Sequence, residues 1–223
     1  MKQLGLRRSL TILFDLDGTL VEYKIKGDEA KKEFLYYISD IGYPVKEIDP
    51  NLPLGLIIKL LSKNSEERAK ELLKTANHIY KKYEIEAARL TKTKEFAVET
   101  LMTLKDKKIN VGVTTNNSKE AVMLSLKKSK LLEYIDVIVT RDDVVEIKPS
   151  PEMLIKAACL LKAPLNMCMH VGDSYVDVMA ARSSGMMAVA VVGGVSPIDT
   201  LNKYQPHFVI NDLRELLTLV NDY

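Results

Sequence analysis

The sequence predicts an α/β protein in which a doubly wound parallel sheet forms the core and a small all-helical cap domain is inserted into it. Three observations predict this class. Short apolar runs rich in β-branched residues alternate with helical patterns, as in parallel sheets covered by helices on both faces. Residues that favour helix starts follow several of these runs closely. One long segment near the N-terminus has helical patterns only and interrupts the alternation.

Six apolar runs have the length and composition of buried strands. These runs are Leu10–Phe14, Ile109–Thr114, Val137–Thr140, Met167–Val171, Ala188–Val192 and Phe208–Ile210. Three helix starts fit behind them, because each places an N-cap residue or a proline at the beginning of a helical pattern. These starts are Asn117 with Glu120, Ser150 before Pro151, and Ser174 with Asp177.

The segment between the first two strands predicts a separate helical unit. Its helical patterns cover Asp28–Ile41, Leu54–Ser62 and Ser65–Leu90, with proline and glycine turns between them. About seventy residues are too many for a loop within a compact domain. We therefore predict a cap domain at residues 21–91 and a core domain at residues 1–20 and 92–223.

The charge composition argues against nucleic acid and membranes as partners. Lysine and arginine number 32 against 30 acidic residues, a net charge of +2, which gives no electrostatic basis for binding polyanions. The apolar run Leu10–Phe14 is too short for a secretion signal, and no run reaches the length of a membrane helix. Cys159 and Cys168 do not have the spacing of a metal or redox motif. We expect a cytoplasmic protein that is a monomer or a homodimer.

The first predicted strand is followed by Asp15-Leu16-Asp17-Gly18-Thr19. Strand alternation places the Asp15 and Asp17 carboxylates on a common side. Two adjacent carboxylates repel each other unless a cation is present or one of them holds a proton. The carboxyl ends of parallel strands are also where open α/β sheets bind their ligands. The pattern therefore predicts a site that binds a cation or transfers protons.

Three more segments lie at the ends of later strands and complete a pattern. They are Val113-Thr114-Thr115-Asn116-Asn117, Lys148-Pro149-Ser150-Pro151, and Gly172-Asp173-Ser174 through Asp177. With the first motif, and in this order, they resemble the four motifs of the haloacid dehalogenase (HAD) superfamily, which has a Rossmann-like core. The helical segment resembles the cap of the phosphoglycolate phosphatase branch.

The resemblance implies a reaction and roles for particular residues. Asp15 is expected to attack phosphorus and form an aspartyl-phosphate, and Asp17 to act as general acid and base. Mg²⁺ is expected as the cofactor, held by the Asp15 carboxylate, the Asp17 backbone carbonyl and Asp173. Thr115 and the backbone near Asn116 would bind a phosphate oxygen. Lys148 would supply the compensating positive charge.

Four further residues are expected to support the site. Gly18 permits the close turn after the nucleophile, and Gly172 permits close backbone approach before Asp173. Ser174 and Asp177 have two readings. Their spacing is that of a capping box, which needs no active site, but Asp177 also suits a role in supporting the metal or Lys148.

Single positions discriminate among the reactions of this superfamily. Dehalogenases and phosphonate-cleaving relatives generally lack the second acid, so Asp17 favours phosphoryl transfer. Hydrolysis of a small phosphorylated metabolite, such as a phosphoglycolate-like monoester, is the expected activity. The alternatives are a sugar-phosphate mutase similar to β-phosphoglucomutase, or a pyrophosphatase. Cap residues available to read the leaving group are Lys24, Lys26, Lys59, Arg68 and Tyr43.

Overall fold

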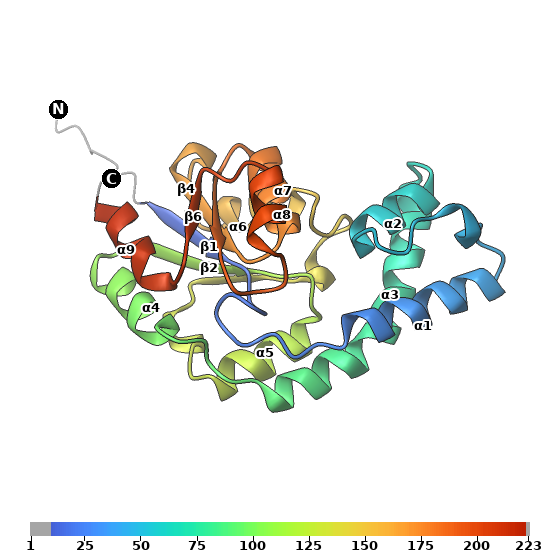
Figure 1. The fold of residues 1–223 in the computed structure, drawn as a ribbon, viewed down its shortest axis with the longest axis horizontal. Helices are drawn as coiled ribbons and strands as arrows, with labels where there is room; N and C mark the ends of the chain where they lie inside the picture. The colour runs from blue at the N-terminus through green and yellow to red at the C-terminus, as the bar shows by residue number, and fades with distance from the viewer. Residues whose placement is uncertain (1–9, 222–223) are drawn as a thin grey trace.

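A six-stranded parallel sheet forms the centre of the computed structural model, which describes residues 10–221. Its strand order is β3-β2-β1-β4-β5-β6 (Figure 1). The strands are β1 (Thr11–Phe14), β2 (Asn110–Thr114), β3 (Val137–Val139), β4 (Cys168–Gly172), β5 (Met187–Val191) and β6 (Phe208–Ile210). Each predicted strand is confirmed to within one residue at either end. The first nine residues of the predicted core lie outside the described residues.

Helices cover both faces of the sheet, as the alternation predicts. One face carries α4 (Ala97–Asp106), α5 (Lys119–Lys128) and α9 (Leu213–Asn221), and the other carries α6 (Glu152–Leu160), α7 (Tyr175–Ser184) and α8 (Ile198–Lys203). Within β1, Ile12 and Phe14 pack into the first layer and Leu13 into the second, because successive strand side chains point to opposite faces. Short 3₁₀ turns η2 (Leu132–Tyr134), η3 (Arg141–Asp143) and η4 (Leu165–Met167) complete the connections.

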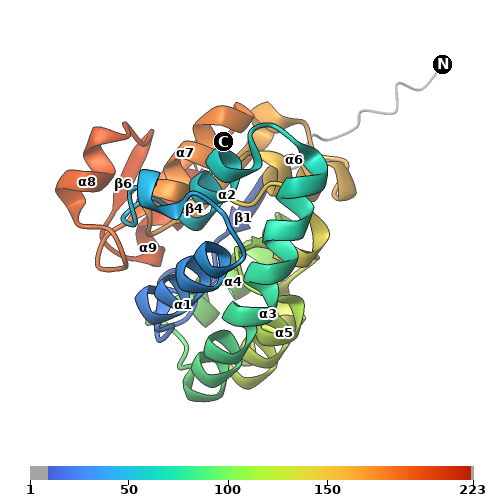
Figure 2. The same cartoon turned by 90° about the vertical axis from the view of Figure 1, so that its right-hand side faces the viewer.

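Helices α1 (Gly27–Asp40), α2 (Leu54–Ser62) and α3 (Glu66–Leu90), with the 3₁₀ turn η1 (Val45–Glu47), form the predicted helical segment. They extend to one side of the sheet, and α3 runs alongside α5 (Figures 1 and 2). The two connections to the core lie together, since Val21 forms an antiparallel bridge with Thr93. The segment therefore leaves and rejoins the core at one place. The domain division at residues 21–91 remains a prediction.

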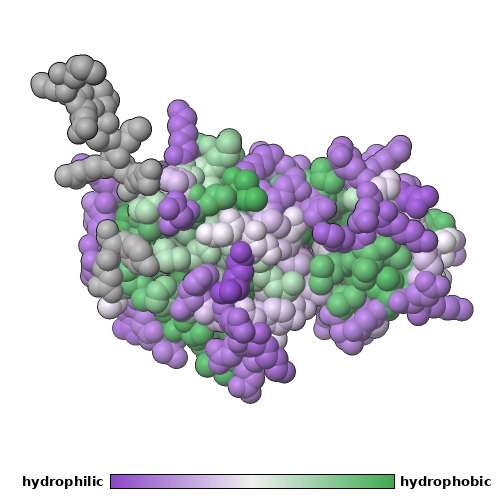
Figure 3. All heavy atoms as spheres, turned by 90° about the horizontal axis from the view of Figure 1, so that it is seen from above, coloured by the Kyte–Doolittle hydropathy of each residue, from purple (hydrophilic) through white to green (hydrophobic). Residues whose placement is uncertain are grey.

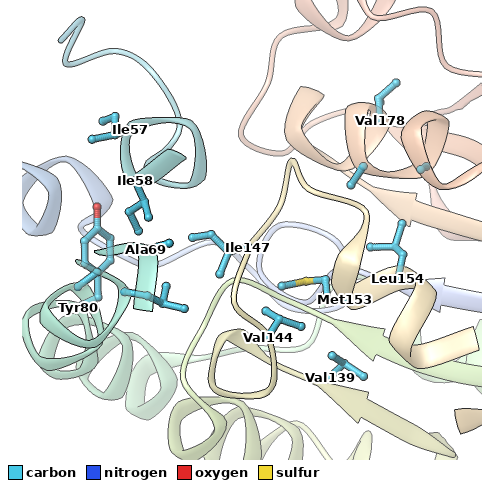
Figure 4. Close-up of a cluster of buried hydrophobic side chains, with 14 of the residues drawn as sticks. Ile57, Ile58, Ala69, Tyr80, Val139, Val144, Ile147, Met153, Leu154 and Val178 are labelled. Atoms are coloured by element: carbon cyan, nitrogen blue, oxygen red, sulfur yellow. The ribbon is translucent and has the colours of Figure 1, made fainter. Parts of the chain in front are cut away.

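An apolar cluster links the helical segment with the core. Ile57, Ile58 and Ala69 of α2 and α3 lie on one side of Ile147, and Val144 and Met153 lie on the other (Figure 4). Burial of these side chains is the main favourable contribution to the contact. The cap helices therefore pack against the core next to Lys148, which follows Ile147 directly.

Two of the predicted helix starts are wrong by one residue. Ser118, not Asn117, is the N-cap of α5, because the Asn117 side chain bonds elsewhere. Pro151 occupies the N-cap of α6, not its first helical position. The predicted capping box of Ser174 and Asp177 is confirmed at the start of α7.

On the face shown in Figure 3 polar and apolar side chains are interspersed, and one continuous apolar area lies over part of the helical segment. None of the helices in the described range combines the length and apolarity that a membrane span requires. Cys159 is exposed and Cys168 is buried, and both are free thiols.

Candidate active site

The carboxyl ends of β1, β2 and β4 open onto one cavity of about 360 Å³, within the range typical of small-ligand sites. Parallel pairing in register brings these ends together, since Phe14 lies opposite both Val113 and Val171. The lining includes most of the predicted site residues. These are Asp15, Asp17, Thr115, Asn116, Lys148, Asp173, Ser174 and Asp177. The cap helices supply much of the opposite wall.

Lys148 holds the predicted nucleophile in place. Its buried Nζ donates to Asp15 Oδ1 at 2.6 Å, to Asp177 Oδ1 at 2.6 Å and to the Thr114 carbonyl at 2.8 Å. Burial alone would lower the pKa of this ammonium, but the two carboxylates raise it above its usual value. Lys148 therefore stays charged and fixes the direction of the Asp15 carboxylate.

Asp177 makes both of the contacts that its sequence position predicts. Its Oδ2 accepts the Ser174 N–H of the capping box at 3.2 Å, while Oδ1 accepts from Lys148 and lies 3.1 Å from His170 Nε2. Burial would raise the pKa of Asp177, but Lys148 and His170 hold it at about 2. The carboxylate is therefore ionised, and α7 and Lys148 share it.

The two predicted glycines are confined by carboxylates. Gly18 has φ of +94°, and a Cβ there would overlap the Asp173 carboxylate. A Cβ at Gly172 would overlap the Asp177 carboxyl group, so this glycine makes room for Asp177, whereas the sequence predicted close approach before Asp173. Both positions therefore exclude larger residues for steric reasons.

The remaining carboxyl groups titrate far from their usual range. Burial and then the Asp15 charge raise the pKa of Asp17 to about 8, although a 2.5 Å hydrogen bond from Asn117 Nδ2 opposes the rise. Burial and the charges of Asp15 and Asp177 raise the pKa of Asp173 to about 7. The pKa of Asp15 is also raised, by burial, against the opposing effect of Lys148. This cluster favours protons or a cation.

The donor set fits a hard divalent cation. One oxygen each from Asp15, Asp173 and Asp177 lies within 4.8 Å of the others, and carboxylate oxygens are the ligands that Mg²⁺ prefers. The Asp17 carboxylate is not in this group, and a role for its backbone carbonyl as a ligand stays a prediction. Lys148 contacts one oxygen of Asp15 and one of Asp177, but the second Asp177 oxygen also accepts the Ser174 N–H. Asp15, with Asp173, is therefore the better candidate ligand.

In the loop after β2, neighbouring side chains contact different site residues, which the sequence did not predict. Thr115 lines the cavity. The Asn116 side chain is occupied by Lys148, whose backbone N–H it accepts at 2.9 Å and whose carbonyl it contacts through Nδ2 at 3.0 Å. Asn117 contacts Asp17. Asn116 therefore positions Lys148, and the Asn117 side chain reaches the predicted general acid.

The cap residues expected to read the leaving group do not line the cavity. Lys24, Lys26 and Lys59 instead form exposed ion pairs with glutamates, and Tyr43 packs against the apolar cluster. None of these residues, nor Arg68, is part of the lining, so their role in reading the leaving group stays untested. Long exposed side chains gain little from pointing inward, whereas the helix faces that meet the core are fixed by packing. The cap-side lining is Tyr23, Ile25, Gly27, Asp28, Lys31, Asn51, Pro53, Leu54, Tyr80 and Glu84.

Sequence reasoning also missed two cations near the site. Lys94, just after the cap, donates to the Gly18 carbonyl at 2.6 Å. Arg141 follows β3 at the same edge of the sheet and is fully buried. The rule that strand ends carry the ligands applies to β3 as well, and would have marked Arg141.

The comparisons with known proteins agree on one family. The sequence model described as haloacid dehalogenase-like hydrolase matches residues 12–191. A protein of Caldanaerobacter subterraneus subsp. tengcongensis, provisionally named pyrophosphatase PpaX, is 35% identical over 94% of this chain and 93% of its own length. Pyrophosphatase PpaX of Bacillus thuringiensis strain Al Hakam is 31% identical over 95% and 96%. A hydrolase structure from Pseudomonas syringae has a TM-score of 0.70 and 28% identity, covering 96% of this chain and 98% of its own.

Proposed function

This chain belongs to the haloacid dehalogenase-like hydrolase family, and on that premise we propose that it is a magnesium-dependent phosphohydrolase acting on a small phosphorylated metabolite. One observation carries the proposal. The Asp15 carboxylate lines a cavity between the sheet edge and the helical segment, fixed by Lys148, with the Asp17 carboxyl group beside it. This is the arrangement that a nucleophile and a neighbouring proton donor require.

The reaction has two steps. An Asp15 carboxylate oxygen attacks phosphorus, the bond from phosphorus to the leaving oxygen breaks, and Asp17 donates its proton to that oxygen. Water then attacks phosphorus of the aspartyl-phosphate and gives a proton to Asp17, which releases inorganic phosphate and restores Asp15. In the metal-free protein the pKa of Asp17 is about 8, which favours the protonated form that the first step needs.

Lys148 and the cation site have complementary tasks. The Lys148 ammonium keeps one Asp15 oxygen engaged, which leaves the other oxygen for attack. Mg²⁺ held by Asp15 and Asp173 would offset the charge of the incoming phosphate and of the acidic cluster. Thr115 supplies a hydroxyl to the same cavity for a phosphate oxygen. We assign neither nucleic acid nor membrane as a partner.

Two substrates rank ahead of others. Pyrophosphate comes first, because the relatives named pyrophosphatase PpaX align along nearly the whole chain. A phosphoglycolate-like monoester is the second. Both carry another anionic group beyond the reacting phosphate, and Lys31 of α1 provides a cation in the cap-side lining. The size of the cavity favours such small compounds over macromolecules.

A substrate panel with matched variants tests the proposal. Pyrophosphate, phosphoglycolate and β-glucose 1-phosphate would be compared with Mg²⁺ for the wild type, Asp15→Asn and Asp28→Asn. Asp15→Asn should lose on the order of a thousandfold in kcat. Asp28→Asn neutralises a cap-side carboxyl of the same cavity and should mainly alter KM. Retained turnover in Asp15→Asn, or a trapped phosphoryl group on another residue, would contradict the mechanism.

A further inference from the structure

A buried ion pair joins the cap helix α3 to the core. Arg141 donates from its two terminal nitrogens to the two Glu84 oxygens at 2.7 and 3.1 Å. Both side chains are 1% exposed. Removing two charges from water is costly, and such pairs often stabilise a fold no more than apolar residues of similar volume. Stability alone therefore gives a poor account of this pair.

Arg141 contacts one face of α3 over two helical turns. Its Nε donates to Asn77, and its guanidinium lies 5.6 Å from the centroid of the Tyr80 ring. Asn77, Tyr80 and Glu84 follow each other at three- and four-residue spacing and so share that face. Three side chains of α3 therefore contact the Arg141 side chain.

Both partners of the pair also contact the loop of residues 115–118, which contains the proposed phosphate site. Arg141 donates to the Asn116 carbonyl at 2.7 Å, and Glu84 Oε2 accepts the Ser118 N–H at 2.9 Å. The Ser118 hydroxyl itself has no hydrogen-bond partner among residues 10–221. The first turn of α5 is therefore capped by a carboxylate from α3, which satisfies an N–H group that the helix cannot satisfy itself.

The contacts continue from this loop to the nucleophile. Asn116 bonds the Lys148 backbone through both ends of its amide, and Lys148 bonds Asp15. Glu84, Arg141, Asn116 and Lys148 thus form a continuous series from a cap helix to the Asp15 carboxylate. Each link is a hydrogen bond of 3.1 Å or less.

We infer that Glu84 and Arg141 are positioning residues. When α3 packs against the core, they fix the conformation of the phosphate-binding loop of residues 115–118. The inference rests on the proposed function for the identity of that loop as a phosphate site. If the inference holds, α3 affects the rate of the reaction as well as the choice of substrate. A displacement of about 1 Å at such a site can cost roughly a hundredfold in rate.

The test replaces the pair without leaving a buried charge. The double variant E84L/R141M removes one negative and one positive charge and substitutes apolar side chains, which such sites often tolerate. The control K81M/E120Q removes an exposed ion pair at 2.6 Å that also joins α3 to the core, through α5. R141K is a third variant, which keeps the charge but loses the two-pronged contact. All three variants have the net charge of the wild type.

Three measurements on the magnesium-loaded protein separate positioning from a structural role. E84L/R141M should retain a cooperative thermal transition, yet bind inorganic phosphate at least tenfold more weakly and lose about 10- to 100-fold in kcat. Without phosphate, the amide hydrogen of Ser118 should exchange at least tenfold faster. K81M/E120Q should match the wild type within about twofold in all three measurements. R141K should give values between those of E84L/R141M and K81M/E120Q. If E84L/R141M does not fold, the results for R141K decide the test.

Two results would overturn the inference. The first is wild-type phosphate affinity and wild-type exchange at Ser118 in E84L/R141M, or in R141K if that variant carries the test. The second is weaker phosphate binding with unchanged exchange in the ligand-free protein, which would mean that Arg141 only contacts the ligand directly. Phosphate affinity and amide exchange can both be measured without turnover. A wild type that hydrolyses nothing in an Asp15-dependent manner would refute the proposed function and would leave the positioning result standing.

Discussion

Replacing Lys148 with methionine is expected to destabilise the protein as well as inactivate it. The substitution keeps the apolar stem and removes an ammonium that contacts Asp15, Asp177 and the Thr114 carbonyl. Two buried carboxylates then face each other without a cation between them. The metal-free protein should show the effect most clearly, because Mg²⁺ could otherwise offset part of the lost charge.

The expected loss of stability follows from the burial of the Lys148–Asp177 ion pair. Lys148 and Asp177 side chains are 3% and 5% exposed, and removing one partner of a buried pair costs about 3–5 kcal/mol. For a chain of this size, the melting temperature should fall by roughly 6–20 °C. The pKa of Asp177 is about 2 when folded and 3.8 in its ordinary state. Its ionised form therefore stabilises the wild type above pH 4, and the difference between the proteins should shrink as pH falls from about 4 to 2.

Urea and thermal unfolding of the metal-free proteins at pH 7 and pH 3 would measure the difference in stability between the wild type and Lys148→Met. Lys82→Met is the matched control, since Lys82 forms an exposed pair with Glu33 and its replacement should change the unfolding midpoints little. Adding Asp177→Asn to Lys148→Met should recover part of the stability but none of the activity. A loss no larger than that of the control, or no recovery in the double variant, would refute the reasoning.

Three more predictions concern the acidic cluster. Asp173→Asn should raise the Mg²⁺ concentration for half-maximal activity by roughly tenfold or more, and further than Asp177→Asn does; equal effects would make Asp177 an equally important ligand. Folding raises the pKa of Asp17 from 3.8 to about 8, so the folded state binds more protons between these values. Urea midpoints of the metal-free protein should therefore fall as pH rises from about 4 to 8, and Asp17→Asn should flatten the slope; an unchanged slope would contradict the assignment. Gly18→Ala should cost roughly 1–3 kcal/mol in urea unfolding, because φ is +94° and the Asp173 carboxylate occupies the space; an unaffected midpoint would show that the turn can move.

The sequence determined the sheet and the position of the site within it. Buried strands require unbroken apolar runs, and parallel strands bring their carboxyl ends to one edge. Acids placed within two residues of the ends of two such runs, Asp15 and Asp173, therefore had to lie near each other. The proline and glycine turns and the helical periods of the inserted segment also fixed α1, α2 and α3 to within one residue at either end.

Only the tertiary structure decided which side chains complete the site. Asn117 meets Asp17 across 100 residues of sequence, Lys94 meets Gly18 across 76 and Arg141 meets Glu84 across 57. No local pattern encodes such contacts, because each depends on how the cap helices are rotated and set against the sheet edge. The same reason explains why the sequence did not single out the cap residues that line the cavity. An amphipathic period tells which face of α3 is buried, but its partner across the interface is set by the packing of two separate elements.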